Sequence, residues 1–140
     1  MEKLLVSAYV FLLFSCTLNA KENAPYLIHG EMTIEASSDY EIAGLDLYLF
    51  NKSEKQISSF TLVFFLFDED GNAPEEARNS IVINVQTEVD PLDSISTCLS
   101  LDKYMYEIPE KEFFVDYIYL SKITYSDGSV WKDPFGQMMF

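Results

Sequence analysis

The sequence is poor in the residues from which most enzyme and metal sites are built. It contains one histidine, His29, and two cysteines, Cys16 and Cys98, among 140 residues. A single histidine excludes a self-contained histidine-rich zinc or copper site. The sequence also has no nucleophile elbow and no phosphate-binding glycine loop. We therefore predict that the chain is not an enzyme, that it uses no cofactor, and that His29 is an ordinary strand or surface residue.

Positive charge is scarce as well. Nine Lys and Arg stand against 23 Asp and Glu, which gives a formal charge of −14 at pH 7. A field of that sign repels phosphate backbones and anionic lipids, so the charge argues against nucleic-acid binding and against a polybasic membrane patch. Hydrophobic residues make up 49% of the chain and aromatic residues 15%, which is enough for a packed core. We expect a single folded domain.

Long apolar runs are absent except at the N-terminus. There, Lys3 precedes a run from Leu4 to Phe14 that only Ser7 interrupts. As a helix this run would extend roughly 16 Å. A transmembrane helix needs roughly 20 residues, so the run is typical of the apolar region of a signal peptide.

The end of this run, Leu13-Phe14-Ser15-Cys16, resembles a bacterial lipobox. The resemblance implies a lipoprotein signal peptide over residues 1–15 and a lipid on Cys16, which becomes the new N-terminus. Phe14 departs from the pattern, because a small or β-branched residue usually stands there. Cleavage after Ala20, as in a secreted protein, is the alternative.

Residues 16–25 are then a short polar tether. If Cys16 carries the lipid, Cys98 is the one thiol left and no internal disulfide can form. Apolar and small residues alternate around Cys98, which predicts a buried, unreactive thiol.

The rest of the chain has the alternation of β-strands. Leu45, Leu47 and Leu49 fall on one face of their segment, whereas residues 59–68 are apolar on both faces and predict a central strand. An Asp-Gly pair, Asp127 and Gly128, predicts a tight hairpin turn. The expected strands are residues 26–36, 40–51, 59–68, 80–87, 94–101, 115–126 and 129–132. This pattern predicts a small antiparallel, all-β sandwich of about seven strands over residues 26–134, followed by a tail over residues 135–140.

A short motif in the third of these segments resembles a known family. Phe64-x-Leu66-Phe67-Asp68, followed by Asp70-Gly71, is similar to the signature of FxLYD-type domains of bacterial exported proteins. Phe67 stands where that signature has Tyr. The resemblance implies an immunoglobulin-like β-sandwich and carries no catalytic activity with it.

The last hairpin provides the candidate binding face. Period two places Tyr117, Tyr119 and Tyr125 on one face of their strand, and Trp131 follows on the return strand. Exposed rings of this kind can stack on sugars or anchor a protein partner. The same rings facing inward would simply be core, and the sequence leaves the two readings open.

An acidic turn provides the nearest approach to an ion site. Asp68, Asp70 and Asn72 lie close together in the sequence, with Glu75 and Glu76 just beyond. Read as a calcium loop, the segment has Ala where glycine is required and Asn where glutamate is required. We therefore predict a turn with solvated carboxylates and no metal site.

These features together predict a non-enzymatic interaction or accessory module of the bacterial cell envelope. It would be exported and tethered to a membrane by lipid on Cys16, or secreted if cleavage follows Ala20, and it would bind a protein partner. The alternative is a carbohydrate- or small-ligand-binding domain that uses the Tyr/Trp face.

Overall fold

The structure is a computed structural model that describes residues 24–74 and 80–139. These residues contain seven β-strands joined by turns and loops. The strands are β1 (Tyr26–Thr33), β2 (Gly44–Asn51), β3 (Ile57–Phe67), β4 (Ile81–Val89), β5 (Ser94–Ser100), β6 (Phe114–Tyr125) and β7 (Val130–Lys132). The predicted signal peptide, Cys16 and the tether up to residue 23 lie outside the described residues.

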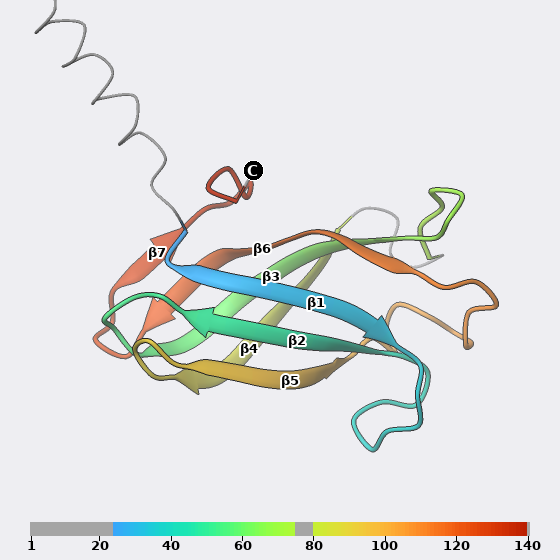
Figure 1. Cartoon of the computed structure of the whole chain (residues 1–140), viewed down its shortest axis with the longest axis horizontal. Helices are drawn as coiled ribbons and strands as arrows, with labels where there is room; N and C mark the ends of the chain where they lie inside the picture. The colour runs from blue at the N-terminus through green and yellow to red at the C-terminus, as the bar shows by residue number, and fades with distance from the viewer. Residues whose placement is uncertain (1–23, 75–79, 140) are drawn as a thin grey trace, which may run out of the picture.

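Two antiparallel sheets face each other in a sandwich-like arrangement (Figure 1). One sheet has three strands in the order β1-β2-β5, and the other has four in the order β4-β3-β6-β7. Strand pairing in both sheets is antiparallel throughout. The all-β prediction is confirmed. Within residues 24–74 and 80–139, no helix is long and apolar enough to cross a bilayer.

The core lies between the two sheets. Leu45, Leu47 and Leu49 of β2 point inward and are buried, as their spacing predicts. The inward residues of β3 are also buried, namely Phe60, Leu62, Phe64 and Leu66. Strand β3 lies between β4 and β6, which confirms that the segment apolar on both faces is a central strand.

The first two strands are shorter than the sequence predicts. Strand β1 ends at Thr33 instead of residue 36, and β2 begins at Gly44 instead of residue 40. The N–H groups of residues 41–43 do not bond to a neighbouring strand, because each donates a hydrogen bond to the Asp102 carboxylate, at 2.8–3.2 Å. The other predicted boundaries agree with the observed ones to within two residues. The segment 101–113 contains no strand and no long helix, which Pro109 disfavours.

Strand β6 does not keep the strict alternation that the sequence predicts. Its register with β3 shifts three times, and the two shifts between Thr61 and Leu62 and between Val63 and Phe65 of β3 each add a residue to β6. Each of these two added residues makes a β-bulge, which reverses the side-chain phase along the strand. Leu120 and Ile123, three positions apart, are consequently both fully buried. The prediction of one continuous tyrosine face along this strand is therefore wrong.

Two buried polar groups connect the sheets. The backbone N–H of Leu120 in β6 donates a 2.8 Å hydrogen bond to the hydroxyl of Tyr26 in β1. The amide nitrogen of Asn51, at the end of β2, donates to the carbonyl oxygens of Val89, the last residue of β4, and of Asp90 after it, both at 3.1 Å. These bonds satisfy polar atoms that would otherwise be stranded in the core.

The strand registers define two ends of the sandwich. At the near end, Tyr26 pairs with Asn51, and the chain enters the fold there through Ala24, which is buried. At the far end, Thr33 pairs with Gly44, and Phe67 pairs with Phe114. The turn 68–74 and the irregular segment 101–113 extend from the far end (Figure 1).

The residues after β7 fold back onto the four-stranded sheet. The buried carboxylate of Asp133 accepts hydrogen bonds from the N–H groups of Gln137 and Met138, at 2.9 and 3.0 Å. Gly136 is buried and Met139 packs against the core. Residues 135–139, which the sequence predicts as a tail, are thus part of the packed domain.

Candidate functional site

Four aromatic rings gather on the outer face of the four-stranded sheet at the far end. Phe65 and Phe67 of β3 stack with their ring centroids 6.2 Å apart, and Phe65 meets the ring of Tyr117 edge-on at 5.9 Å. Phe114 pairs directly with Phe67 across the ladder and so lies on the same face. Tyr117 and Phe114 are 54% and 52% exposed. We call these four residues the outer aromatic cluster.

A β-bulge positions Tyr117 in this cluster. Tyr117 has a positive φ of 49°, which is rare for a residue other than glycine. The Asp116 carboxylate accepts a 2.9 Å hydrogen bond from the backbone N–H of Tyr117. Positive φ at a bulky residue costs free energy, and strain of this kind gathers at functional positions. The bulge is invisible in the sequence, so the alternation pattern misses how Tyr117 and Phe65 come together.

A hollow of about 320 Å³ lies at the same end. Its walls come from the turn 68–74 and the segment 101–113, and they include Pro74, Tyr104, Tyr106 and Lys111. Tyr106 is 74% exposed, the second-highest value among the large hydrophobic and aromatic residues described. For this stretch the sequence predicts a short helical turn or an irregular loop, and it does not identify these residues. An irregular segment of this length is the one available signal, since such loops often carry function.

The acidic turn is organised by hydrogen bonds within the protein. One oxygen of Asp68 accepts the N–H groups of Asp70 and Asn72 at 3.0 and 2.8 Å. The hydrogen bond from Asn72 is the main reason that the pKa of Asp68 lies below its usual value. The ammonium of Lys111 forms an ion pair with Asp70, and it lies 3.8 Å from Glu69. Among residues 24–74 and 80–139, no three His, Cys, Asp or Glu side chains gather closely enough to hold a metal ion.

The four residues of the predicted Tyr/Trp face do not share a face. Tyr117 and Tyr119 lie on the outer side of the sheet, whereas Tyr125 is 7% exposed and pairs with the fully buried Ile57. Trp131 is half-buried and meets the ring of Tyr26 in the other sheet edge-on, at 5.8 Å between centroids. The bulges of β6 separate the outward tyrosines from the inward ones.

The side chain of Tyr119 points away from the core but is covered by the residues that follow β7. Its hydroxyl donates a 3.2 Å hydrogen bond to the carbonyl oxygen of Pro134. Gly136 lies so close that a Cβ there would be 2.9 Å from the ring. Burial raises the pKa of Tyr119. Of the predicted face, Tyr117 alone is more than half exposed.

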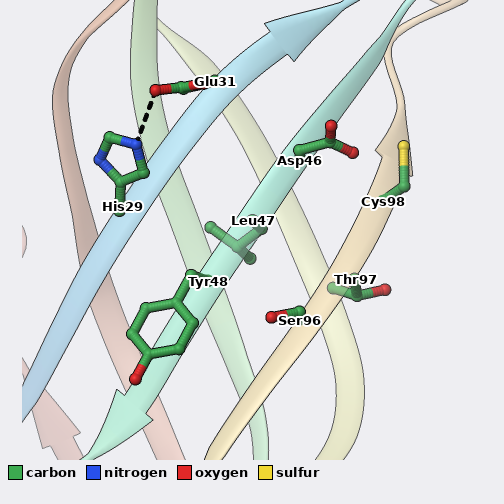
Figure 2. A pocket seen from close by; sticks show the side chains of 8 residues that line it. All are labelled: His29, Glu31, Asp46, Leu47, Tyr48, Ser96, Thr97 and Cys98. Carbon is green, nitrogen blue, oxygen red and sulfur yellow. Dashed lines mark hydrogen bonds and ion pairs between the residues drawn. The ribbon is translucent and has the colours of Figure 1, made fainter. Parts of the chain in front are cut away.

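A second hollow, of about 400 Å³, lies on the outer face of the three-stranded sheet (Figure 2). Its polar lining includes His29 and Glu31 of β1, Asp46 of β2 and Cys98 of β5. The Nε2 atom of His29 lies 3.0 Å from Glu31, and both side chains are largely exposed, so His29 is a surface residue of a strand.

Cys98, predicted to be buried, is half-buried at the edge of this hollow. Burial, together with a hydrogen bond to Asp46, raises the pKa of the Cys98 thiol to about 11. The thiol is therefore protonated at neutral pH and is a poor nucleophile.

The fold resembles that of a protein whose crystal structure is known, a hypothetical protein from Peptoclostridium difficile 630. The two chains superpose with a TM-score of 0.55 at 15% sequence identity, over 80% of this chain and 88% of the other. At that identity the likeness concerns the fold alone. No family model and no curated protein matches this chain. The resemblance to FxLYD-type domains therefore stays a prediction.

Proposed function

We propose that this protein is a non-enzymatic interaction module of the bacterial cell envelope, exported and tethered to a membrane by lipid on Cys16. Its partner would be a protein that docks on the outer aromatic cluster. The observation that supports this most is the exposure of the Phe114 and Tyr117 rings side by side with Phe65 and Phe67. Aromatic groups in contact with solvent are over-represented where proteins bind one another.

The position of the cluster in the fold supports the same proposal. The chain enters the sandwich at the near end, and the cluster lies at the far end. Strand β1, with 8 residues, runs between the two ends and spans about 24 Å. A tether that leads from Cys16 to Ala24 would hold the near end toward the membrane and present the cluster to the periplasm or exterior.

Charge indicates what kind of partner would fit. The net charge of −14 and the exposed acidic residues beside the cluster, Asp116, Glu110 and Glu112, would repel an acidic surface. A complementary partner would present an apolar patch with a basic rim. Such a rim would raise the association rate and make it sensitive to salt.

We also propose that the sandwich is immunoglobulin-like. The strand order supports this, since the first, second and fifth strands form one sheet and the third, fourth, sixth and seventh form the other. Immunoglobulin-like sandwiches divide their seven strands between two sheets in a closely related way.

The test compares two positions of similar exposure at opposite ends. A photo-crosslinking residue, p-benzoylphenylalanine, replaces Phe114 at the far end or Val130 at the near end, which are 52% and 47% exposed. The full chain carrying either residue is expressed in its native cells and irradiated. We expect a discrete cross-linked protein from position 114, several-fold weaker in a Tyr117→Ser background, and none from position 130. Equal yields at the two positions, or no product at position 114, would contradict the proposal.

An oligosaccharide is the second candidate ligand, favoured by the hollow beside the cluster. Tyr104 and Tyr106 line that hollow, and tyrosine rings can stack on sugar rings. Titration calorimetry of the full chain with a panel of soluble cell-wall oligosaccharides tests this. Binding heat that Tyr106→Ala abolishes would favour the sugar; no heat with any member of the panel would exclude it.

A further inference from the structure

The hollow at the far end continues directly into the outer aromatic cluster. Phe67 of the cluster is followed by Asp68, and Phe114 is preceded by Phe113; both Asp68 and Phe113 line the hollow. Because Phe67 and Phe114 pair across the ladder, the two segments that wall the hollow leave the cluster at the same place. A partner that docks on the cluster would therefore also cover the hollow.

The charge of the hollow is negative. Three carboxylates and one ammonium line it, namely Asp68, Glu107, Glu110 and Lys111. The ammonium is neutralised within the protein, since Lys111 forms an ion pair with Asp70 and lies 3.8 Å from Glu69. Within the described part of the chain, Glu107 and Glu110 form no ion pair. The hollow thus has carboxylates without a cationic partner, on a molecule whose net charge of −14 attracts cations as a whole.

Aromatic side chains form much of the remaining wall. Tyr104, Tyr106 and Phe113 all line the hollow. The Tyr104 hydroxyl approaches the carbonyl oxygen of Val82 in β4 at 3.5 Å, which ties this wall to the four-stranded sheet. The face of an aromatic ring attracts a cation that lies within about 6 Å of its centre. Aromatic walls combined with unpaired carboxylates are complementary to an organic cation.

We propose that the hollow is the pocket for an arginine side chain of the protein partner. This inference rests on the proposed function, because the arginine belongs to the partner that docks on the outer aromatic cluster. Its guanidinium lies against a tyrosine ring of the hollow and pairs with Glu107 or Glu110, while the surface around it covers the cluster.

The chemistry of the lining favours arginine over lysine. A guanidinium is planar, stacks on aromatic rings and donates two parallel hydrogen bonds to one carboxylate, whereas an ammonium is a compact, strongly hydrated point charge. Arginine is also enriched among the residues that dominate protein–protein binding. The volume of about 320 Å³ lies at the lower end of the range of ligand pockets, which suits a single side chain.

A small-molecule titration tests the pocket without the partner. The probe is N-acetyl-arginine amide, whose one charge is the guanidinium, and the matched compound is N-acetyl-citrulline amide, which has a similar shape and no charge. Nuclear magnetic resonance of the ¹⁵N-labelled, detergent-solubilised full chain reports binding. We expect saturable shifts in residues 68–74 and 101–113, with roughly tenfold weaker binding of the citrulline compound.

Paired charge variants locate the site. The double variant Glu107→Gln, Glu110→Gln removes two charges from the hollow, and Glu31→Gln, Glu88→Gln removes two exposed charges elsewhere. We expect the first to weaken binding of the arginine compound roughly tenfold and the second to leave it unchanged. Equal effects of the two double variants, or equal binding of the two compounds, would overturn the proposal. So would the absence of saturable shifts with the arginine compound; shifts with a neutral oligosaccharide would then assign the hollow to a sugar.

Cross-linking in native cells tests whether the partner fills the pocket. With p-benzoylphenylalanine at position 114, Glu107→Lys, Glu110→Lys should weaken the cross-linked product several-fold, because the new ammonium groups repel the guanidinium. Glu31→Lys, Glu88→Lys makes the same change in net charge and should leave the yield intact. An undiminished product in the pocket variant would overturn this inference and leave the proposed function standing. A missing product in the otherwise wild-type chain would instead contradict the proposed function, and with it the partner as the source of the arginine.

Discussion

Asn51 is a fully buried polar side chain that joins three segments at the near end. Its amide nitrogen donates hydrogen bonds to the carbonyl oxygens of Lys55, Val89 and Asp90, and its oxygen accepts the N–H and hydroxyl of Ser53. Removing the side-chain amide would remove five hydrogen bonds, and the N–H of Ser53 would lose the side-chain oxygen that accepts it. Each buried group left unsatisfied costs about 1–3 kcal/mol.

We therefore predict that Asn51→Ala lowers the free energy of unfolding by about 3 kcal/mol. Urea unfolding followed by tryptophan fluorescence measures the change. Asn84→Ala is the matched control, since Asn84 is exposed and accepts one hydrogen bond from Thr61. The control should change stability by less than about 0.5 kcal/mol. Equal effects of the two substitutions would contradict the assigned role of Asn51.

Asp102 gives stability a defined dependence on pH. Hydrogen bonds from the N–H groups of Glu41 and Ile42 hold the pKa of its carboxyl below the usual value of 3.8. A carboxyl with a lowered folded-state pKa contributes stability that is fully present above its unfolded pKa. That contribution is lost as the pH falls below about 4 and through the folded pKa.

The prediction is that Asp102→Ala lowers the melting temperature at pH 7 and flattens its decline between pH 4 and pH 2. Asp102→Asn keeps an acceptor oxygen but cannot titrate, so it should retain more of the stability at pH 7 and show the same flattened decline. Differential scanning calorimetry across this pH range is the measurement. If the melting temperature declined as steeply in both variants as in the wild type, other carboxylates would dominate the pH dependence of stability. Asp127, whose pKa is about 2, is one of them.

At the scale of the element, the bulges of β6 decide which side chains face the partner sheet. Lys122 pairs with Thr61, whereas Leu120 pairs with the next residue of β3, Leu62, so Ser121 is the extra residue. Without it, Leu120 and Ile123 could not both point inward, because strict alternation places residues three apart on opposite faces.

Deletion of Ser121 should therefore expel one large aliphatic side chain from the core. We expect a loss of at least about 3 kcal/mol in the free energy of unfolding, comparable to removing a buried leucine. Ser121→Ala keeps the backbone bulge and should cost less than about 1 kcal/mol. Chemical denaturation of the two variants makes the comparison, and a deletion variant as stable as the wild type would contradict the assigned phase of β6.

At the scale of the whole molecule, the cellular location of the protein and its orientation at a membrane depend on how the N-terminus is processed. The lipobox-like residues 13–16 predict a mature protein that begins at lipid-modified Cys16, which would attach the near end of the sandwich to a membrane. Cleavage after Ala20 would instead release the domain with Lys21 as its first residue.

Intact-mass analysis of the protein from native cells distinguishes the two outcomes. We expect an N-terminal Cys16 with the added mass of its lipid, partitioning into the detergent phase. In Cys16→Ala that added mass should be absent. An unmodified N-terminus at Lys21 in the wild type would exclude the lipid anchor and leave export alone.

Much of the fold could be predicted from the sequence, because strand formation depends on local patterns. The alternation of Leu45, Leu47 and Leu49 has a period of two, which suits one buried face of a sheet. The apolar segment around Leu62 predicts a strand covered on both sides, and β3 is central. The turn at Asp127 and Gly128 follows from residue chemistry, since Gly128 adopts a φ of 84°.

Only the tertiary structure decided where these strands begin, which faces they bury and where aromatic rings meet solvent. Strand β2 begins at Gly44 in part because Asp102, 61 residues beyond Glu41, caps the residues before it. The facing of Tyr117 and Tyr125 depends on bulges that form as β6 pairs with β3. Within the described residues, β5 becomes the edge of its sheet only once the strand order is set. The physical reason is the same in each case: these features depend on contacts between distant segments, which short-range periodicity does not encode.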